Sequence, residues 1–163
     1  MLERRCQRPF GLFVVVVLTA VLFAYPATAN AASVVATING GGTAIMDPVS
    51  FAQGTTAFGI HATLYSDGTA RGQINCVDQL GSTFPGNIFG EVTSWEGSLD
   101  GSVTLHVTGK FVGFPGGHPQ DVSFSVTIQQ FGGAGVGHWT LAIGGFTFCV
   151  ETLRSGQIVM RRP

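Results

Sequence analysis

Apolar and polar residues alternate along most of the chain after residue 31. TTAFGIHATLYS (55–66) and SVTLHVTGKF (102–111) place an apolar side chain at every second position, which is the period of a half-buried strand. Glycine or proline interrupts most stretches of helical length, and both destabilise a helix interior. The predicted strands cover residues 33–38, 55–66, 68–79, 88–97, 102–111, 122–131, 138–143, 146–153 and 157–162.

Turn residues separate these predicted strands. Asp67-Gly68 is a strong hairpin signal, and Ser155-Gly156 marks a break between the last two strands. Gly40–Gly42 indicates a bulge or sharp turn, because no Lys-Ser/Thr pair follows it as in a phosphate-binding loop. Short strands with frequent turns and one polar face predict an all-β, antiparallel fold of about eight or nine strands, either a β-sandwich or a small β-barrel.

Strand phase also predicts which aromatic side chains are buried. The residues on apolar phases, expected in the core, are Phe58, Phe124, Trp139, Phe146 and Phe148. The aromatic residues at strand ends or in loops are Phe84, Phe89, Phe111 and Phe114. Loop aromatics either cover the end of a core or form a binding surface, and we expect the first.

The first 31 residues have the three parts of a secretory signal peptide. Arg4, Arg5 and Arg8 precede the apolar run FGLFVVVVLTAVLFA, and Ala-x-Ala motifs end at Ala29 and Ala31. The run is shorter than the ~20 residues of a membrane-spanning helix. We therefore expect secretion to the periplasm or the medium, removal of residues 1–31, a single β-rich domain at 32–163, and no membrane span in the mature chain.

Few charged residues remain after residue 31. Five are basic and eight are acidic, so the net charge of residues 32–163 is −3. No basic patch is present, which argues against a nucleic-acid partner.

Two cysteines, Cys76 and Cys149, follow the predicted signal peptide. An oxidising compartment favours a single disulfide between them, and two buried free thiols are the alternative. Neither cysteine has a second cysteine or a histidine at zinc-ligand spacing, so no metal site is expected.

Catalytic motifs are missing from the sequence. His61, His106 and His138 fall on polar phases of separate strands, which predicts one exposed histidine per strand. The densest group of acids, Glu91, Glu96 and Asp100, is expected to be solvated. No G-x-S-x-G motif occurs. We expect no catalytic residue and no cofactor.

The stretch FVGFPGGHPQDVSF (111–124) predicts a hairpin connection. Gly116-Gly117 permits the turn, and Asp121 is expected to cap it. Phe114, His118 and Asp121 are nevertheless the candidates for a binding loop, since they lie at or beside a rigid tip flanked by aromatic residues.

Four stretches taken together resemble an uncharacterised class of small secreted bacterial β-domains, found in the neighbourhood of the post-COAP type of domain. They are GGGTA (40–44), TAFGIHA (56–62), SDGTARGQINCVDQ (66–79) and ETLRSGQIVMRR (151–162). The resemblance implies a compact β-fold and bacterial export. It implies no activity and transfers no catalytic residue.

Three functions follow from these patterns. The first is a secreted, non-catalytic module that binds or adheres to a surface or extracellular partner. The second is a small barrel that binds an apolar ligand, with phenylalanine and tryptophan lining its lumen. The third is an extracellular hydrolase. A filled interior favours the first function over the second, and an internal cavity favours the second.

Overall fold

A computed structural model describes residues 31–48, 50–79 and 81–163 of the chain. The predicted signal peptide therefore lies outside the described residues, except for Ala31. The strands are β1 (Val34–Met46), β2 (Thr55–Tyr65), β3 (Thr69–Asp78), β4 (Gly86–Gly97), β5 (Val103–Gly113), β6 (Gln120–Gln130), β7 (Gly132–Gly133), β8 (His138–Ile143) and β9 (Phe146–Arg161). No helix in this part of the chain is long and apolar enough to cross a membrane.

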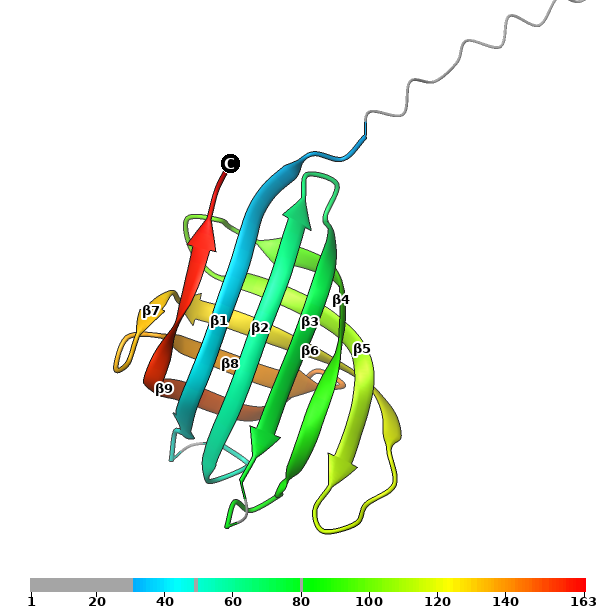
Figure 1. Ribbon diagram of the computed structural model, residues 1–163, viewed down its shortest axis with the longest axis vertical. Coiled ribbons are helices and arrows are strands. Elements are labelled where there is room, and N and C mark those ends of the chain that lie inside the picture. Colours follow the sequence, from blue (N-terminus) through cyan, green and yellow to red (C-terminus); the bar gives the residue numbers. More distant parts are fainter. Residues whose placement is uncertain (1–30, 49, 80) are drawn as a thin grey trace, which may run out of the picture. The chain divides into compact units, whose positions relative to one another are not determined.

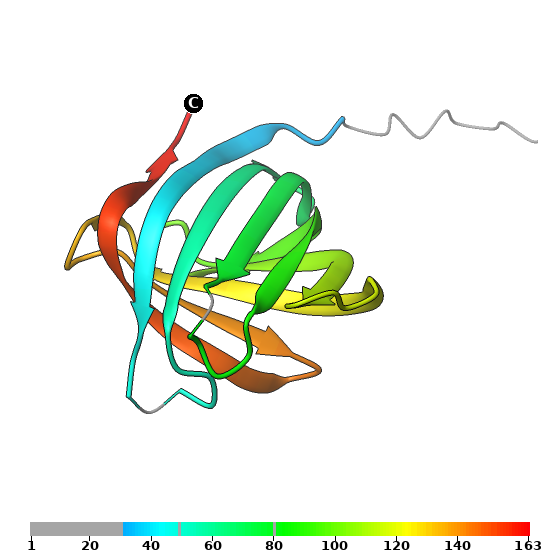
Figure 2. The same ribbon diagram turned by 60° about the horizontal axis from the view of Figure 1, so that its bottom comes forward.

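The strands form a closed, eight-stranded antiparallel barrel (Figures 1 and 2). Each strand from β1 to β5 pairs with the strand that follows it, β6 pairs with β8, and β8 pairs with β9. β9 then pairs with β1 and closes the ring, while the two-residue β7 pairs with Gln157 and Ile158 of β9, beyond the residues that pair with β8. The all-β, antiparallel prediction is confirmed, and the barrel is the correct one of the two predicted architectures.

Two predicted breaks do not interrupt their strands. Gly40–Gly42 lies inside β1, where it pairs with β2 on one side and β9 on the other, so no sharp turn forms there. The predicted strands 146–153 and 157–162 form one bent strand, β9, which ends at Arg161 and has a register shift opposite Thr43 and Ala44. Strand pairing continues through these glycines, although Gly42 and Gly156 have positive φ angles of 150° and 78°.

Inward-pointing apolar side chains fill most of the barrel. Trp139 is buried and packs on Phe58, with their ring centroids 5.6 Å apart. The prediction that Phe146 lies in the core is wrong, because this residue begins β9 at the rim and is 57% exposed. Other large buried residues are Ile38, Leu64, Ile74, Leu105, Ile128, Leu141, Leu153 and Ile158.

The antiparallel order places four connections at the same end of the barrel. These are the β1–β2, β3–β4, β5–β6 and β8–β9 connections, and we call this end the pocket end. Figure 2 brings it forward. The Phe114 N–H donates to the carbonyl of Pro85 at 2.8 Å, which ties the β5–β6 loop to the β3–β4 loop.

Candidate functional site

A cavity of about 160 Å³ remains inside the barrel at the pocket end. Its apolar lining consists of Phe84, Ile88, Phe111, Leu141, Ile143 and Phe148. Gly86 and three buried residues that carry reactive groups, Cys76, Asp78 and Cys149, complete the lining. We call this cavity the lumen pocket. Buried apolar side chains fill most of the interior, so this cavity is a local gap in the packed core.

Four aromatic rings gather beside the lumen pocket. Phe51 stacks on Phe84 with ring centroids 5.1 Å apart, and it meets Phe146 edge to face at 5.3 Å. Phe148 lies 5.7 Å from Phe84. Phe51 is 55% exposed and Phe84 is 38% exposed. This phenylalanine cluster joins the pocket lining to the surface and leaves an apolar patch in water.

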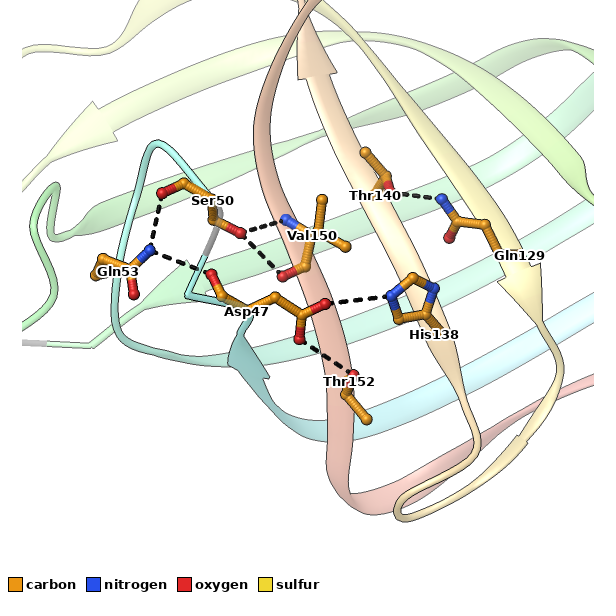
Figure 3. Close-up of polar contacts among 8 residues, drawn as sticks. All are labelled: Asp47, Ser50, Gln53, Gln129, His138, Thr140, Val150 and Thr152. Atoms are coloured by element: carbon orange, nitrogen blue, oxygen red, sulfur yellow. Dashed lines mark hydrogen bonds and ion pairs between the residues drawn. The ribbon is translucent and has the colours of Figure 1, made fainter.

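The β1–β2 loop that carries Phe51 is fastened to β9 (Figure 3). The Ser50 hydroxyl accepts a hydrogen bond from the Val150 N–H at 2.8 Å and donates one to the Val150 carbonyl at 3.1 Å. Gln53 Nε2 donates to the Ser50 carbonyl at 2.8 Å and so closes the loop on itself. These bonds position Phe51 next to the segment that contains Cys149 and Glu151.

Two Cys-Val-acid tripeptides face the lumen at this end. Cys76-Val77-Asp78 ends β3, and Cys149-Val150-Glu151 lies in the first half of β9. Side chains alternate between faces of a strand, so each thiol and its carboxylate point inward while each valine points outward. All four inward residues are buried. The repeated Cys-x-acid spacing was the sequence signal for this site, and the search for a second cysteine or histidine missed it.

The four polar side chains interact mainly with one another. Cys149 Sγ donates to Glu151 Oε1 at 3.0 Å, and the Thr56 hydroxyl donates to Glu151 Oε2. Cys76 Sγ lies 4.0 Å from Asp78 Oδ1. The buried polar and charged residues in the described ranges are Ser50, Thr56, Asp78 and Glu151. No basic side chain in these ranges is therefore buried with the two carboxylates.

Burial raises the pKa of all four groups, the two carboxyls and the two thiols. Burial, with a smaller contribution from the charge of Glu151, raises the pKa of Asp78 to about 7. Burial also raises the pKa of Glu151 to about 7, although hydrogen bonds from Thr56 and Cys149 oppose the shift. Burial raises the pKa of both thiols as well. The site therefore tends to retain protons, or to exchange them for a cation.

The expected disulfide is not formed in the structure, where Cys76 and Cys149 are both free and buried. β1 and β2 separate β3 from β9 around the barrel. The two cysteines are consequently on strands that do not pair, and their sulfur atoms are not at bonding distance. Each thiol instead lies beside the carboxylate two residues further along its own strand.

We expect both thiols to react slowly with Ellman's reagent in the folded protein and rapidly after unfolding. Burial blocks access to the thiols and, by raising their pKa, lowers the thiolate fraction. The measurement uses a Cys6→Ser background without reductant, in native buffer and in guanidinium chloride. A disulfide would leave no titratable thiol in either condition, and fast native reaction would contradict the observed burial.

The three loop candidates do not form a joint site. Asp121 lies on β6 opposite Lys110 of β5, and the two side chains form an ion pair at 2.6 Å. The hydrogen bond from Lys110 lowers the pKa of Asp121. Asp121 is thus a cross-strand partner and not the expected turn cap. His118 and Phe114 are exposed in the loop, and no hydrogen bond or ion pair in the described residues joins the three.

The strand histidines lie on separate strands as predicted, but only His61 is exposed while the other two are half-buried, and each contacts a polar neighbour. His61 contacts Asn39 at 2.7 Å, His106 contacts Glu96 at 3.3 Å and His138 contacts Asp47 at 3.5 Å. The last of these pairs belongs to the attachment of the β1–β2 loop, where Asp47 also accepts a hydrogen bond from Thr152 at 3.3 Å (Figure 3). The contacts lie on different strands and do not converge.

A larger hollow of about 820 Å³ lies on the outer surface, over β1 to β5. Four glycines, Gly40, Gly59, Gly90 and Gly109, also line it, and at Gly59 an added Cβ would meet nothing within 4 Å. Its polar and aromatic lining includes His61, Gln73, Asn75, Asn87, Phe89, Glu91, Thr108 and Lys110. We call this hollow the outer groove. Glu91 is its only carboxylate among the described lining residues.

No protein-family model matches the chain, and no curated protein or solved structure is significantly similar to it.

Proposed function

We propose that this protein is a non-catalytic binding barrel that holds a small, mainly apolar ligand in the lumen pocket. The observation that carries the proposal is the cavity of about 160 Å³ lined by phenylalanine, isoleucine and leucine. An engineered apolar cavity of about 150 Å³ stays dry and binds benzene. The expected ligand is therefore a single ring or a short branched chain.

The phenylalanine cluster supports the same proposal. Its rings extend from the pocket lining to the surface, so a small apolar molecule meets apolar contacts along its whole path. Phe51 and Phe146 also leave enough exposed apolar area to attract such a molecule from water. The N-terminal pattern supports export, and we place this binding outside the cytoplasm.

The test uses fluorobenzene as the probe and fluorine NMR as the readout, with EDTA and a reducing agent in the buffer. We expect saturable binding to the purified protein. Ile143→Phe adds volume to the lumen pocket and is expected to weaken binding at least about tenfold, because overfilling a cavity removes the space the ligand needs. Ile45→Phe makes the same change at an exposed position of β1 and should leave binding unchanged.

Equal binding by the wild-type protein and the Ile143→Phe variant would contradict the proposal, as would the absence of saturable binding. Circular dichroism and thermal unfolding of both variants establish that each is folded before binding is compared.

The outer groove supports a second candidate, a module that binds a polar polymer such as a polysaccharide. Amide side chains and an aromatic ring beside the lining glycines suit sugar hydroxyls and sugar ring faces. A single carboxylate does not provide the acid pair that glycoside hydrolysis requires, so binding is favoured over hydrolysis. Binding that survives Ile143→Phe but is lost in Gln73→Ala would assign the partner to the outer groove.

A further inference from the structure

We infer that Cys76, Asp78 and Glu151 form a binding site for a divalent, thiol-preferring metal ion such as Zn²⁺. One donor atom from each residue lies within 4.8 Å of the other two. Bond lengths of about 2.0–2.3 Å in a tetrahedral zinc site place donor atoms roughly 3.5 Å apart. Small side-chain rotations, each moving a donor by about 1 Å, are thus enough to bring the three groups onto one ion.

The two buried carboxyl groups of the lumen lack a basic partner among the described residues. Asp78 is 7% exposed and lines the lumen pocket. The one hydrogen-bond contact of its carboxyl group in the described residues is the weak contact with Cys76 Sγ at 4.0 Å. No basic side chain in these residues is buried with it. Buried carboxylates are normally paired, protonated or bound to a metal, so Asp78, which has no buried basic partner among the described residues, either keeps its proton or exchanges it for a cation.

The donor set selects the kind of cation. A cysteine sulfur is a soft donor that suits zinc, whereas magnesium and calcium bind oxygen atoms and usually need six or more of them. An organic ammonium ion would pair with the carboxylates but would gain little from the sulfur. The combination of Cys76 with two carboxylates therefore favours zinc over these alternatives.

Two further side chains orient one of the proposed ligands. Cys149 Sγ donates to one oxygen of Glu151, and the Thr56 hydroxyl donates to the other. Hydrogen bonds of this kind hold a metal-binding carboxylate in position and typically change affinity 10–100-fold. Cys149 is outside the group of three mutually close donors, so we assign it this positioning role.

Three protein ligands leave one position of a tetrahedral ion unfilled. Cys76 and Asp78 line the lumen pocket, so that position lies beside the space in which the apolar ligand is proposed to bind. A ligand with one polar atom could then contact the ion while its apolar part fills the pocket. Only the contact between a bound ligand and the ion rests on the proposed function. The metal site itself is inferred from the positions of the three donor groups.

The experiment measures zinc in the purified, reduced protein, in a Cys6→Ser background that removes the third cysteine of the chain. After equilibration with zinc and gel filtration, we expect one zinc ion per chain. Cobalt should give a thiolate-to-cobalt charge-transfer band. Cys76→Ser, Asp78→Asn and Glu151→Gln should each weaken zinc binding more than about 100-fold, and Cys149→Ser and Thr56→Val about 10–100-fold. His138→Ala, on the outer surface, should have no effect.

Less than half an ion per chain in the wild-type protein would overturn the inference. So would undiminished binding by Asp78→Asn, or loss of zinc in His138→Ala. Zinc should also raise the unfolding temperature of the wild-type protein, and EDTA should reverse the rise, which tests the site even if a variant does not fold. Fluorobenzene binding in EDTA tests the lumen pocket without metal, so the failure of either proposal is distinguishable from failure of the other.

Discussion

The double substitution Asp78→Asn and Glu151→Gln is expected to stabilise the metal-free protein at about pH 8 and to remove most of the fall in its stability between about pH 5 and pH 8. Both carboxyls are buried without a basic partner, and the pKa of each is raised to about 7 in the folded protein. In the unfolded chain they titrate near their ordinary values of 3.8 and 4.5. Between about pH 4 and about pH 7, the folded state therefore binds more protons at these two groups than the unfolded state does.

The sign of the effect follows from this difference in proton binding. The contribution of these two groups to stability is greatest below about pH 4, falls as the pH rises towards about 7, and stays at the lower level above it. Each pKa unit corresponds to about 1.4 kcal/mol, so a shift of about 3 units sets an upper bound of roughly 4 kcal/mol for one group. The two groups interact, so we expect the double variant to gain about 3–5 kcal/mol at about pH 8, less than twice the single bound.

Urea unfolding followed by tryptophan fluorescence, in EDTA and reductant, measures the free energy of unfolding at each pH. Asp121→Asn is the matched control, because this exposed acid pairs with Lys110 and its pKa is lowered. The control variant should keep the wild-type fall in stability. A wild-type protein equally stable at about pH 5 and pH 8, or a double variant with an undiminished fall, would contradict the raised pKa values.

Local features of the fold were predictable because they depend on neighbouring residues. The Asp67-Gly68 turn forms as expected, with Asp67 Oδ1 accepting a hydrogen bond from the Thr69 N–H at 2.9 Å. Period-two alternation along residues 68–79 places Cys76 on the same face as Ile74, and both are buried. Such signals establish the strands and their buried faces, but they carry no information on which distant strands meet.

The candidate site could not be predicted, because it depends on which distant strands meet. Cys76 and Glu151 come together only because β9 returns to β1 and closes the barrel, and strand phase is the same in an open sandwich. The two cysteines were predicted to form a disulfide, with two buried free thiols as the alternative, and neither prediction placed the acids two residues further on beside them. Phe146 has a core-like phase, yet it is exposed because its strand begins at the rim.

Closure of the barrel should depend strongly on Gly156, and we expect Gly156→Ala to cost about 4 kcal/mol of the free energy of unfolding. Gly156 pairs with Gly42 between the first and last strands. Its φ angle is 78°, and an added Cβ would lie 1.9 Å from the carbonyl oxygen of Gly41. The atoms nearest to the added Cβ all belong to the backbone of Gly41 and Gly42. The clash can therefore be relieved only by moving β1 away from β9.

Gly116→Ala provides a matched control for this substitution. Gly116 has nearly the same φ angle, 76°, but an added Cβ would meet nothing within 4 Å. Its substitution should cost only the left-handed conformation of an alanine, about 1 kcal/mol. The difference between the two variants therefore isolates the contribution of close strand approach from that of backbone conformation.

Urea unfolding gives the two free energies, and light scattering reports whether the variants associate. Separation of β1 from β9 would expose two strand edges, which readily pair with other chains, so Gly156→Ala should also increase association whereas Gly116→Ala should not. Equal destabilisation by the two substitutions would show that close approach at Gly156 contributes little. A large effect confined to Gly156→Ala would identify the β1–β9 seam as the contact that holds the lumen, and with it the Cys76, Asp78 and Glu151 site, in its closed geometry.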